Sequence, residues 1–275
     1  MAESPRPKSN LFLRLATAAV AAPLLLWLLY LGPAWGFPAV TTLVCLLGAW
    51  ELSAMASPQH LGVRLWNLVA TLGVISATAL PAAAAHFPLL LMALVCGGML
   101  ANLARPEPME GAAARLAWSI AGPLYLGTLF GALILLFRRD HGGSWVVLAL
   151  LFSFISDTAG YFVGRAIGKR KLSPVVSPKK TIEGSLGGLA GGVLSGLLAH
   201  FWFLPVLPLL HAVLLALVAT ALGQAGDLCE SLIKRSVGIK DSGNILPGHG
   251  GILDRSDAML FCGAAVWAYV SFFAS

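Results

Sequence analysis

The chain has 275 residues, of which 58% are hydrophobic and 11% are charged. One soluble core cannot bury this much apolar surface, so the composition excludes an ordinary soluble domain and predicts an integral protein surrounded by membrane lipid. The formal charge of +6 does not indicate a nucleic-acid partner, because the basic residues are scattered between apolar runs and form no stripe with interleaved aromatic residues.

About nine apolar runs follow one another, each close to the ~20 residues with which a helix crosses a bilayer core. They centre near Leu24, Val44, Leu72, Leu91, Leu126, Leu151, Leu189, Leu215 and Ala265. The pattern therefore predicts an all-α, polytopic integral membrane protein with about nine transmembrane helices. The first run follows a basic start, as in a signal peptide, but it is long and more runs follow, so we expect a retained span.

Basic residues occupy alternate connections between these runs. The connections without Lys or Arg are 32–36, 81–86 and 203–208. The basic connections lie near Arg64, near Arg105 and Arg115, at 168–180 and at 234–255. Because positive charge favours the cytoplasmic side, we expect a cytoplasmic N-terminus and an external C-terminus, with Arg138 and Arg139 as an exception on an outer loop.

An acidic residue interrupts the apolar run near Leu151. A carboxylate at bilayer depth costs at least ~2.5 kcal/mol on insertion scales, so Asp157 is a candidate functional residue. Tyr161 and Arg165 follow one and two helical turns later, on the same face. An internal structural pair is the alternative, and the pattern leaves both interpretations open.

The next polar segment, SPVVSPKKTIEG, presents Lys179 and Lys180 beside Thr181. Its two Ser-Pro steps disfavour a helix. On its own the segment is typical of a basic membrane-surface anchor. The glycine-rich run 184–196 that follows opens an apolar run and no βαβ unit, which favours close helix packing over a nucleotide-binding loop.

A second polar segment begins at the end of the eighth apolar run. Four residues recur there at helical spacing and so share one face: Asp227, Glu230, Ser231 and Lys234. A glycine-rich stretch with His249 follows, and glycines leave backbone amides free to bind an anion. Asp254, Arg255 and Asp257 then open the ninth run.

Carboxylates at two helix ends, with a basic glycine-rich loop between them, are suited to holding a divalent cation and phosphate groups. We expect Mg²⁺, because carboxylate oxygens are hard ligands and this ion commonly shares its shell with substrate phosphate. Asp227 and Asp254 are the predicted ligands, with Glu230 and Asp257 as inner or water-mediated neighbours. No HxxxH motif or cysteine cluster indicates zinc.

Nearby cations are the predicted phosphate ligands: Lys179, Lys180, Lys234, Arg235, Lys240 and Arg255. We expect His249 to hydrogen-bond to phosphate, with a general base or support of the turn as alternatives. The alternative to a metal site is a set of ion pairs, Asp254 with Arg255 or Asp227 with Lys234.

These residues resemble the C-terminal signature of the phosphatidate cytidylyltransferase family, the CDP-diacylglycerol synthases. The matching positions are Ser231, Ile233, Lys234, Arg235, Lys240, Asp241, Pro247, His249, Gly250, Gly251, Ile252, Asp254, Arg255 and Asp257. The segments DTAGYFVGRAIGKRKLSP and SPKKTIEG are also similar to the family, so the resemblance runs from about Phe152 onward. Ile182, Ser256 and the order Ala159-Gly160 depart from its pattern.

The resemblance implies the reaction of CTP with phosphatidate to give CDP-diacylglycerol and diphosphate. The lipid phosphate can attack the α-phosphorus of CTP directly, so positioning and charge neutralisation suffice without a protein nucleophile. The implied catalytic residues are Asp227, Asp254, Lys234 and His249. Further substrate-binding positions are Thr181, Ser231, Asp241, Gly250 and Gly251. Family analogy also implies K⁺ beside Mg²⁺ and a homodimer.

We therefore expect N-terminal transmembrane helices in 1–140 and a catalytic transmembrane region in 141–275, with cytoplasmic loops at 168–184 and 226–257. The expected location is a bacterial-type inner membrane. An ion-coupled transporter is an alternative. Such a transporter would have paired broken spans in two related halves, whereas the polar groups of this chain are concentrated in its second half. A CTP-dependent lipid kinase, which would release CDP, is the other alternative.

Overall fold

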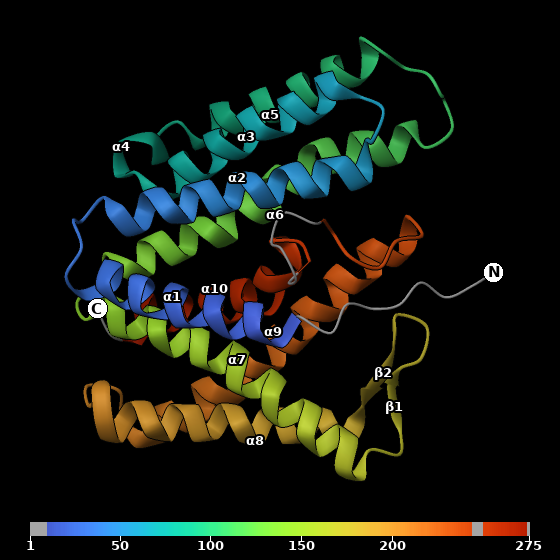
Figure 1. Ribbon diagram of the computed structural model, residues 1–275. Helices are drawn as coiled ribbons and strands as arrows, with labels where there is room; N and C mark the ends of the chain where they lie inside the picture. The colour runs from blue at the N-terminus through green and yellow to red at the C-terminus, as the bar shows by residue number, and fades with distance from the viewer. Residues whose placement is uncertain (1–9, 244–249, 274–275) are drawn as a thin grey trace.

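The computed structural model describes residues 10–243 and 250–273 of the chain (Figure 1). Helices make up nearly all of the regular structure in these residues, as expected for an all-α membrane protein. In chain order the elements are α1 (Asn10–Tyr30), α2 (Gly36–Ala56), α3 (Leu61–Ala79), α4 (Pro81–Ala84), α5 (Phe87–Leu103), α6 (Ala112–Phe137), α7 (Gly142–Ile167), β1 (Lys171–Ser173), β2 (Ser177–Thr181), α8 (Ile182–Leu198), the π-helix η1 (Ala199–Phe203), α9 (Leu209–Ser236) and α10 (Leu253–Phe273).

Seven helices of the described chain are long and apolar enough to cross a membrane. They are α2, α3, α6, α7, α8 continued by η1, α9 and α10. Two further apolar helices, α5 and the part of α1 over Ala19–Tyr30, are shorter. The expected count of nine is therefore not confirmed. In the case of α5, the short helix α4 and a turn take up the start of the apolar run, which leaves 17 residues for α5.

The helices form two groups that meet along α6 and α10. The first group contains α2, α3, α5 and α6, and the second contains α7, α8, α9 and α10. Figure 1 shows them as successive layers, with α10 next to α6 and α2 at the junction. A buried apolar cluster that includes Phe130 of α6 and Leu253 and Leu260 of α10 joins the two groups.

Small residues allow α8 to pack closely between α7 and α9. Five glycines of α8 are buried, and a Cβ atom added at Gly196 would lie 2.6 Å from the carbonyl oxygen of Ala212 in α9. Small side chains let helix backbones approach in lipid, where the hydrophobic effect does not drive helices together. The interpretation of 184–196 as a packing segment is confirmed.

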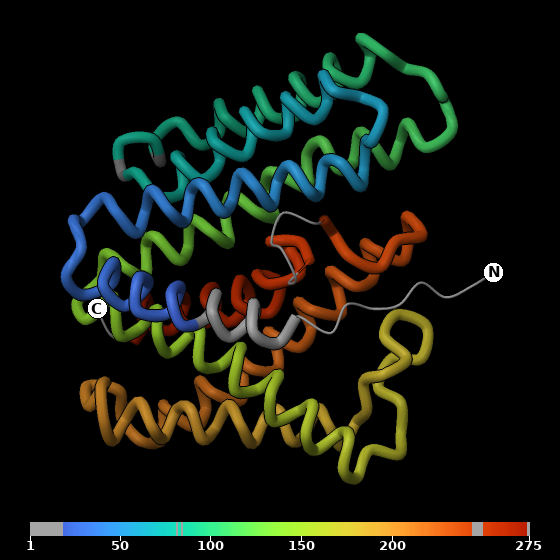
Figure 2. The backbone as a smooth tube through the Cα atoms, viewed as in Figure 1, coloured from blue at the N-terminus to red at the C-terminus, as the bar shows by residue number. Residues whose placement is uncertain are grey.

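The segment with two Ser-Pro steps forms an antiparallel hairpin, in which Lys171 pairs with Thr181 and Ser173 with Ser177. The sequence predicted that this segment is not helical, but it did not predict the strands. Thr181 then caps α8, because its hydroxyl accepts a hydrogen bond of 3.1 Å from the amide of Gly184. The cap fixes where the hairpin ends and the helix begins. Figure 2 shows this hairpin at the same end of the molecule as the end of α9.

Candidate active site

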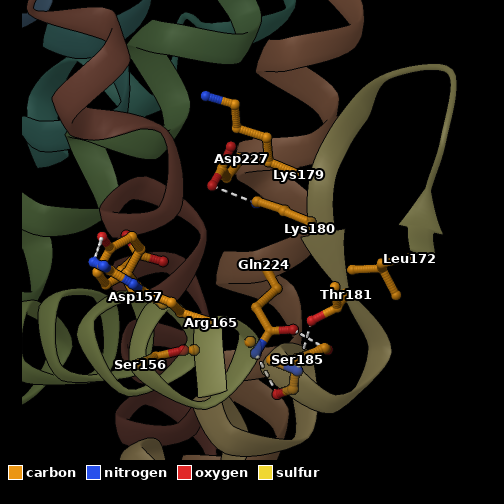
Figure 3. A pocket seen from close by; sticks show the side chains of 14 residues that line it. Ser156, Asp157, Arg165, Leu172, Lys179, Lys180, Thr181, Ser185, Gln224 and Asp227 are labelled. Carbon is orange, nitrogen blue, oxygen red and sulfur yellow. Dashed lines mark hydrogen bonds and ion pairs between the residues drawn. The ribbon is translucent and has the colours of Figure 1, made fainter. Parts of the chain in front are cut away.

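A cavity of about 380 Å³ lies between α7, the hairpin, the first turn of α8 and α9 (Figure 3). Its lining brings together five of the predicted site residues: Asp157, Lys179, Lys180, Thr181 and Asp227. Asp157 exposes its side chain here. The lysines come from the end of β2. This end of the strand lies at the cavity because Thr181 joins it directly to α8.

One ion pair crosses this cavity. The ammonium of Lys180 pairs with Oδ2 of Asp227, which joins the hairpin to α9 (Figure 3). Both side chains remain partly exposed, at 30% and 24%. The hydroxyl of Ser231, one turn further along α9, donates to Oδ1 of Asp227 over 3.4 Å. Asp227 is therefore paired as the structural alternative anticipated, but with Lys180 instead of Lys234.

Uncharged polar groups line another part of the cavity. The Gln224 amide donates to the backbone oxygen of Ser185 over 3.0 Å, and the Ser185 hydroxyl donates back to Oε1 of Gln224. Arg165 also lines the cavity and donates to the hydroxyl of Tyr161 over 3.1 Å. Gln224 and Ser185 were not predicted from the sequence. Gln224 lies three residues before Asp227, so helical spacing could have identified it.

A second polar cluster lies where α9 ends and α10 begins. The ammonium of Lys234 lies 2.5 Å from Oε2 of Glu230 and 2.5 Å from Oδ1 of Asp254. The other oxygen of Asp254 accepts hydrogen bonds from the amides of Ser242 and Gly251, over 2.9 and 3.0 Å. Asp254 therefore pairs with Lys234, and the same carboxylate holds both ends of the loop between Ser242 and Gly251.

Glycine is required at one position of this loop. Gly250 has a φ angle of +84°, and a Cβ atom there would also lie 3.2 Å from Oδ2 of Asp254. A side chain in this backbone conformation is strained. Gly250 thus supports the site through its backbone.

The first group of helices contributes one buried carboxylate, Glu51 of α2. Its oxygens accept hydrogen bonds from the hydroxyl of Ser242 and from the amides of Ile252 and Leu253. Glu51 was not predicted from the sequence, although it carries the same signal as Asp157, an acidic residue within an apolar run.

The remaining acids lie close enough to repel one another. The carboxylate of Asp257 interacts electrostatically with those of Asp227, Glu230 and Asp157. Glu230 is fully buried, and neither of its oxygens has a hydrogen bond of good geometry within the described residues. A buried carboxylate in this condition requires a cation, which Lys234 supplies here.

The fit to Mg²⁺ can be judged from these groups. Within residues 10–243 and 250–273, no three His, Cys, Asp or Glu side chains lie close enough together to hold an ion by themselves. Mg²⁺ usually needs only one or two carboxylates, because water and substrate phosphate complete its shell. The position of Lys234 between Glu230 and Asp254 shows that a cation fits between two acids, so the residues fit the ion.

Comparisons with known proteins identify the family of the chain. Residues 12–273 match the model of the Cytidylyltransferase family. The chain belongs to this cytidylyltransferase family. A protein of Brucella suis biovar 1, named phosphatidate cytidylyltransferase, is 34% identical over 97% of this chain and 95% of its own length. The protein of that name from Bacillus subtilis is 44% identical over 50% of this chain, and the chain spans about half of its length (52%).

The structure also describes the other predicted residues of this cytidylyltransferase chain, except His249. Arg235 donates to the carbonyl oxygen of Ile239 over 3.0 Å, and Lys240 and Asp241 are exposed. Arg255 interacts electrostatically with Asp157. His249 lies outside the described residues, and its assignment stays a prediction.

Proposed function

We propose that the chain is a phosphatidate cytidylyltransferase that converts CTP and phosphatidate into CDP-diacylglycerol and diphosphate. The observation that carries this proposal is the similarity along 97% of the chain to a protein of that name. The site supports it, because cationic side chains and carboxylates converge beside a cavity in a membrane protein. Neither an ion-coupled transporter nor a lipid kinase is supported by the relatives.

In this proposal the phosphate of phosphatidate attacks the α-phosphorus of CTP, and the bond to the departing diphosphate breaks. Both substrates are anionic, so the protein must reduce their repulsion. Lys179 and Lys180 at the cavity would bind phosphate oxygens. Lys234, Arg235, Lys240 and Arg255 are the further cations proposed to bind phosphate. Gln224 and Ser185 offer hydrogen bonds to an uncharged part of either substrate. Catalysis then consists of positioning and charge neutralisation, without a protein nucleophile.

The sequence predicted Asp227 and Asp254 as the ligands of Mg²⁺, but these two carboxylates lie in different clusters, paired with Lys180 and Lys234 respectively. In the revised proposal Glu230 and Asp254, which both contact Lys234, would hold the ion, with Asp227 and Asp257 as neighbours. When bound, the ion would neutralise negative charge on the phosphate oxygens. Displacement of Lys234 from the two acids would free its ammonium to bind phosphate. K⁺ beside Mg²⁺ is a further part of the proposal. It predicts lower activity when a large organic cation replaces K⁺.

The assay that tests the function uses detergent-purified protein with CTP, Mg²⁺ and phosphatidate. Formation of CDP-diacylglycerol and diphosphate in equal amounts is expected. Release of CDP with a phosphorylated lipid would instead show kinase activity. If neither product forms under these conditions, the proposed function is wrong.

We also propose an inner-membrane location, with the N-terminus, the hairpin and the Lys234 cluster on the cytoplasmic side. The basic connections support this orientation. Helices α1 and α5 would complete nine spans if they cross the membrane as well. A cysteine placed at Val175, which is 89% exposed in the hairpin, should react with an impermeant reagent in inverted vesicles and not in right-side-out vesicles, once the native cysteines are replaced. Cross-linking in the same membranes would test for the expected homodimer.

A further inference from the structure

Glu51 is a buried carboxylate that contacts the active-site loop from the opposite group of helices. It is 3% exposed. Oε2 accepts hydrogen bonds from the hydroxyl of Ser242 over 3.1 Å and from the amide of Leu253 over 2.9 Å. Oε1 accepts from the amide of Ile252 over 3.1 Å. Burial of a carboxylate is costly unless hydrogen bonds compensate for lost water, and these three bonds do so.

The bonds join parts of the chain that are remote in sequence. Glu51 is separated from Ser242 by 191 residues and from Leu253 by 202. The amides of Ile252 and Leu253 stand at the N-terminal end of α10, where backbone amides lack partners within the helix and favour negative charge. Glu51 therefore caps α10 from α2.

The same residues connect Glu51 to the acids and lysine of the site. Ser242 donates its hydroxyl hydrogen to Glu51 and its amide hydrogen to Oδ2 of Asp254. Asp254 in turn pairs with Lys234. Glu51 is thus linked to Asp254 through Ser242, and to Lys234 through Asp254. If Ser242 moved relative to Glu51, its hydrogen bond to Asp254 would be disturbed as well.

Two glycines enclose the carboxylate. A Cβ atom at Gly243 would lie 2.5 Å from Oε1 of Glu51, and one at Gly251 would lie 2.7 Å from Oε2 and 2.0 Å from the hydroxyl of Ser242. The backbone at Gly243 and at Gly251 therefore lies directly on the carboxylate. This close fit fixes these two residues against α2.

We propose that Glu51 is a positioning residue for the reaction. This role rests on the proposed function. It holds Ser242 and the start of α10 in the arrangement in which Asp254 and Lys234 can act on the substrates. The first group of helices thereby contributes to catalysis through one side chain, besides its role in the membrane.

The Glu51→Gln variant tests this proposal because it keeps the size of the side chain but turns an NH₂ group toward amide donors. Peptides containing Ile252 and Leu253 should exchange amide hydrogen faster than in the wild type. The folded variant should lose turnover on the order of 100-fold, the effect of misplacing a catalytic group by about 1 Å, while KM for CTP changes little. Ser242→Ala should give a smaller effect of the same kind, and it should add little in the Glu51→Gln background.

Ser53→Ala is the matched control. Ser53 is also buried in α2, but its contacts are with Ala49 and Asn67. It should leave exchange at Ile252 and Leu253 and turnover unchanged.

Full turnover by Glu51→Gln, or a loss no larger than the unfolded fraction, would overturn the positioning role. A wild-type protein that makes no CDP-diacylglycerol overturns the proposed function instead, and hydrogen exchange still decides whether Glu51 holds the loop. If Glu51→Gln does not fold, the Ser242→Ala variant decides by the same two measurements.

Discussion

Lys234 and Asp254 join the last turn of α9 to the first turn of α10, with 2.5 Å between the ammonium nitrogen and Oδ1. The same ammonium also lies 2.5 Å from Glu230. Lys234 therefore occupies the space between two predicted ligands of Mg²⁺. A divalent cation and this lysine would neutralise the same charges, which makes the stability of the site dependent on which of them is present.

Lys234→Met should destabilise the protein by about 3–5 kcal/mol, because it leaves Glu230 buried without its cation. Mg²⁺ should then raise the melting temperature of this variant more than that of the wild type. Thermal unfolding in detergent, with and without Mg²⁺, measures both effects. Lys171→Met, an exposed lysine of β1, is the control and should melt as the wild type does. Equal Mg²⁺ shifts in Lys234→Met and wild type would contradict a metal between Glu230 and Asp254.

Asp227→Asn and Asp254→Asn should each lower turnover by on the order of 100-fold or more, since each removes charge on which the transition state depends. Under the metal interpretation, the activity that remains in the folded fraction of each variant responds more weakly to Mg²⁺. Under the alternative of purely structural ion pairs, with Lys180 and Lys234 respectively, stability falls while the folded fraction remains active. Activity against Mg²⁺ concentration, normalised to folded protein, separates the two.

The sequence singled out several of the residues that line the cavity, because the signal for each was local. The helical spacing of Asp227 and Ser231 and the adjacent Lys179 and Lys180 are features of short segments, and these segments meet around one cavity. Asp157 was identified by the cost of a charge in an apolar run, which also needs no knowledge of the fold.

Partners across the fold could not be predicted in this way. Lys180 reaches Asp227 because the hairpin turns β2 back over the cavity, and the two short strands gave no pattern of alternating residues that would predict them. Glu51 contacts the loop because α2 packs near α10, a relation between helices almost 200 residues apart. Sequence spacing does not encode which helices become neighbours.

Lys180→Ala should lower kcat/KM for the reaction by on the order of 10- to 100-fold, because a charge-assisted contact with phosphate is lost and Asp227 is left without its cation. Lys179→Ala should have a smaller effect, since Lys179 is exposed. Lys171→Ala changes the other strand of the same hairpin and should leave kcat/KM unchanged. Similar values of kcat/KM for all three variants would indicate that Lys179 and Lys180 serve membrane topology and do not bind substrate.

Gly196→Ala should destabilise the protein without affecting the chemistry of the site. The new Cβ atom would lie 2.6 Å from the carbonyl oxygen of Ala212 and 3.3 Å from the Cβ atom of Ala216. Because the nearest atom belongs to the backbone of α9, relief requires the two helices to separate, and overpacking of this kind costs about 1–3 kcal/mol.

Gly48→Ala is the matched control, since Gly48 also lies within a helix and is buried, yet a Cβ atom there would have no neighbour within 4 Å. The control should be neutral or more stable, because alanine favours a helix over glycine by up to about 1 kcal/mol. Melting temperatures in detergent provide the comparison, and turnover per folded molecule should stay near the wild-type value in both variants. Equal melting temperatures for Gly196→Ala and Gly48→Ala would show that α8 and α9 do not require a glycine at their contact.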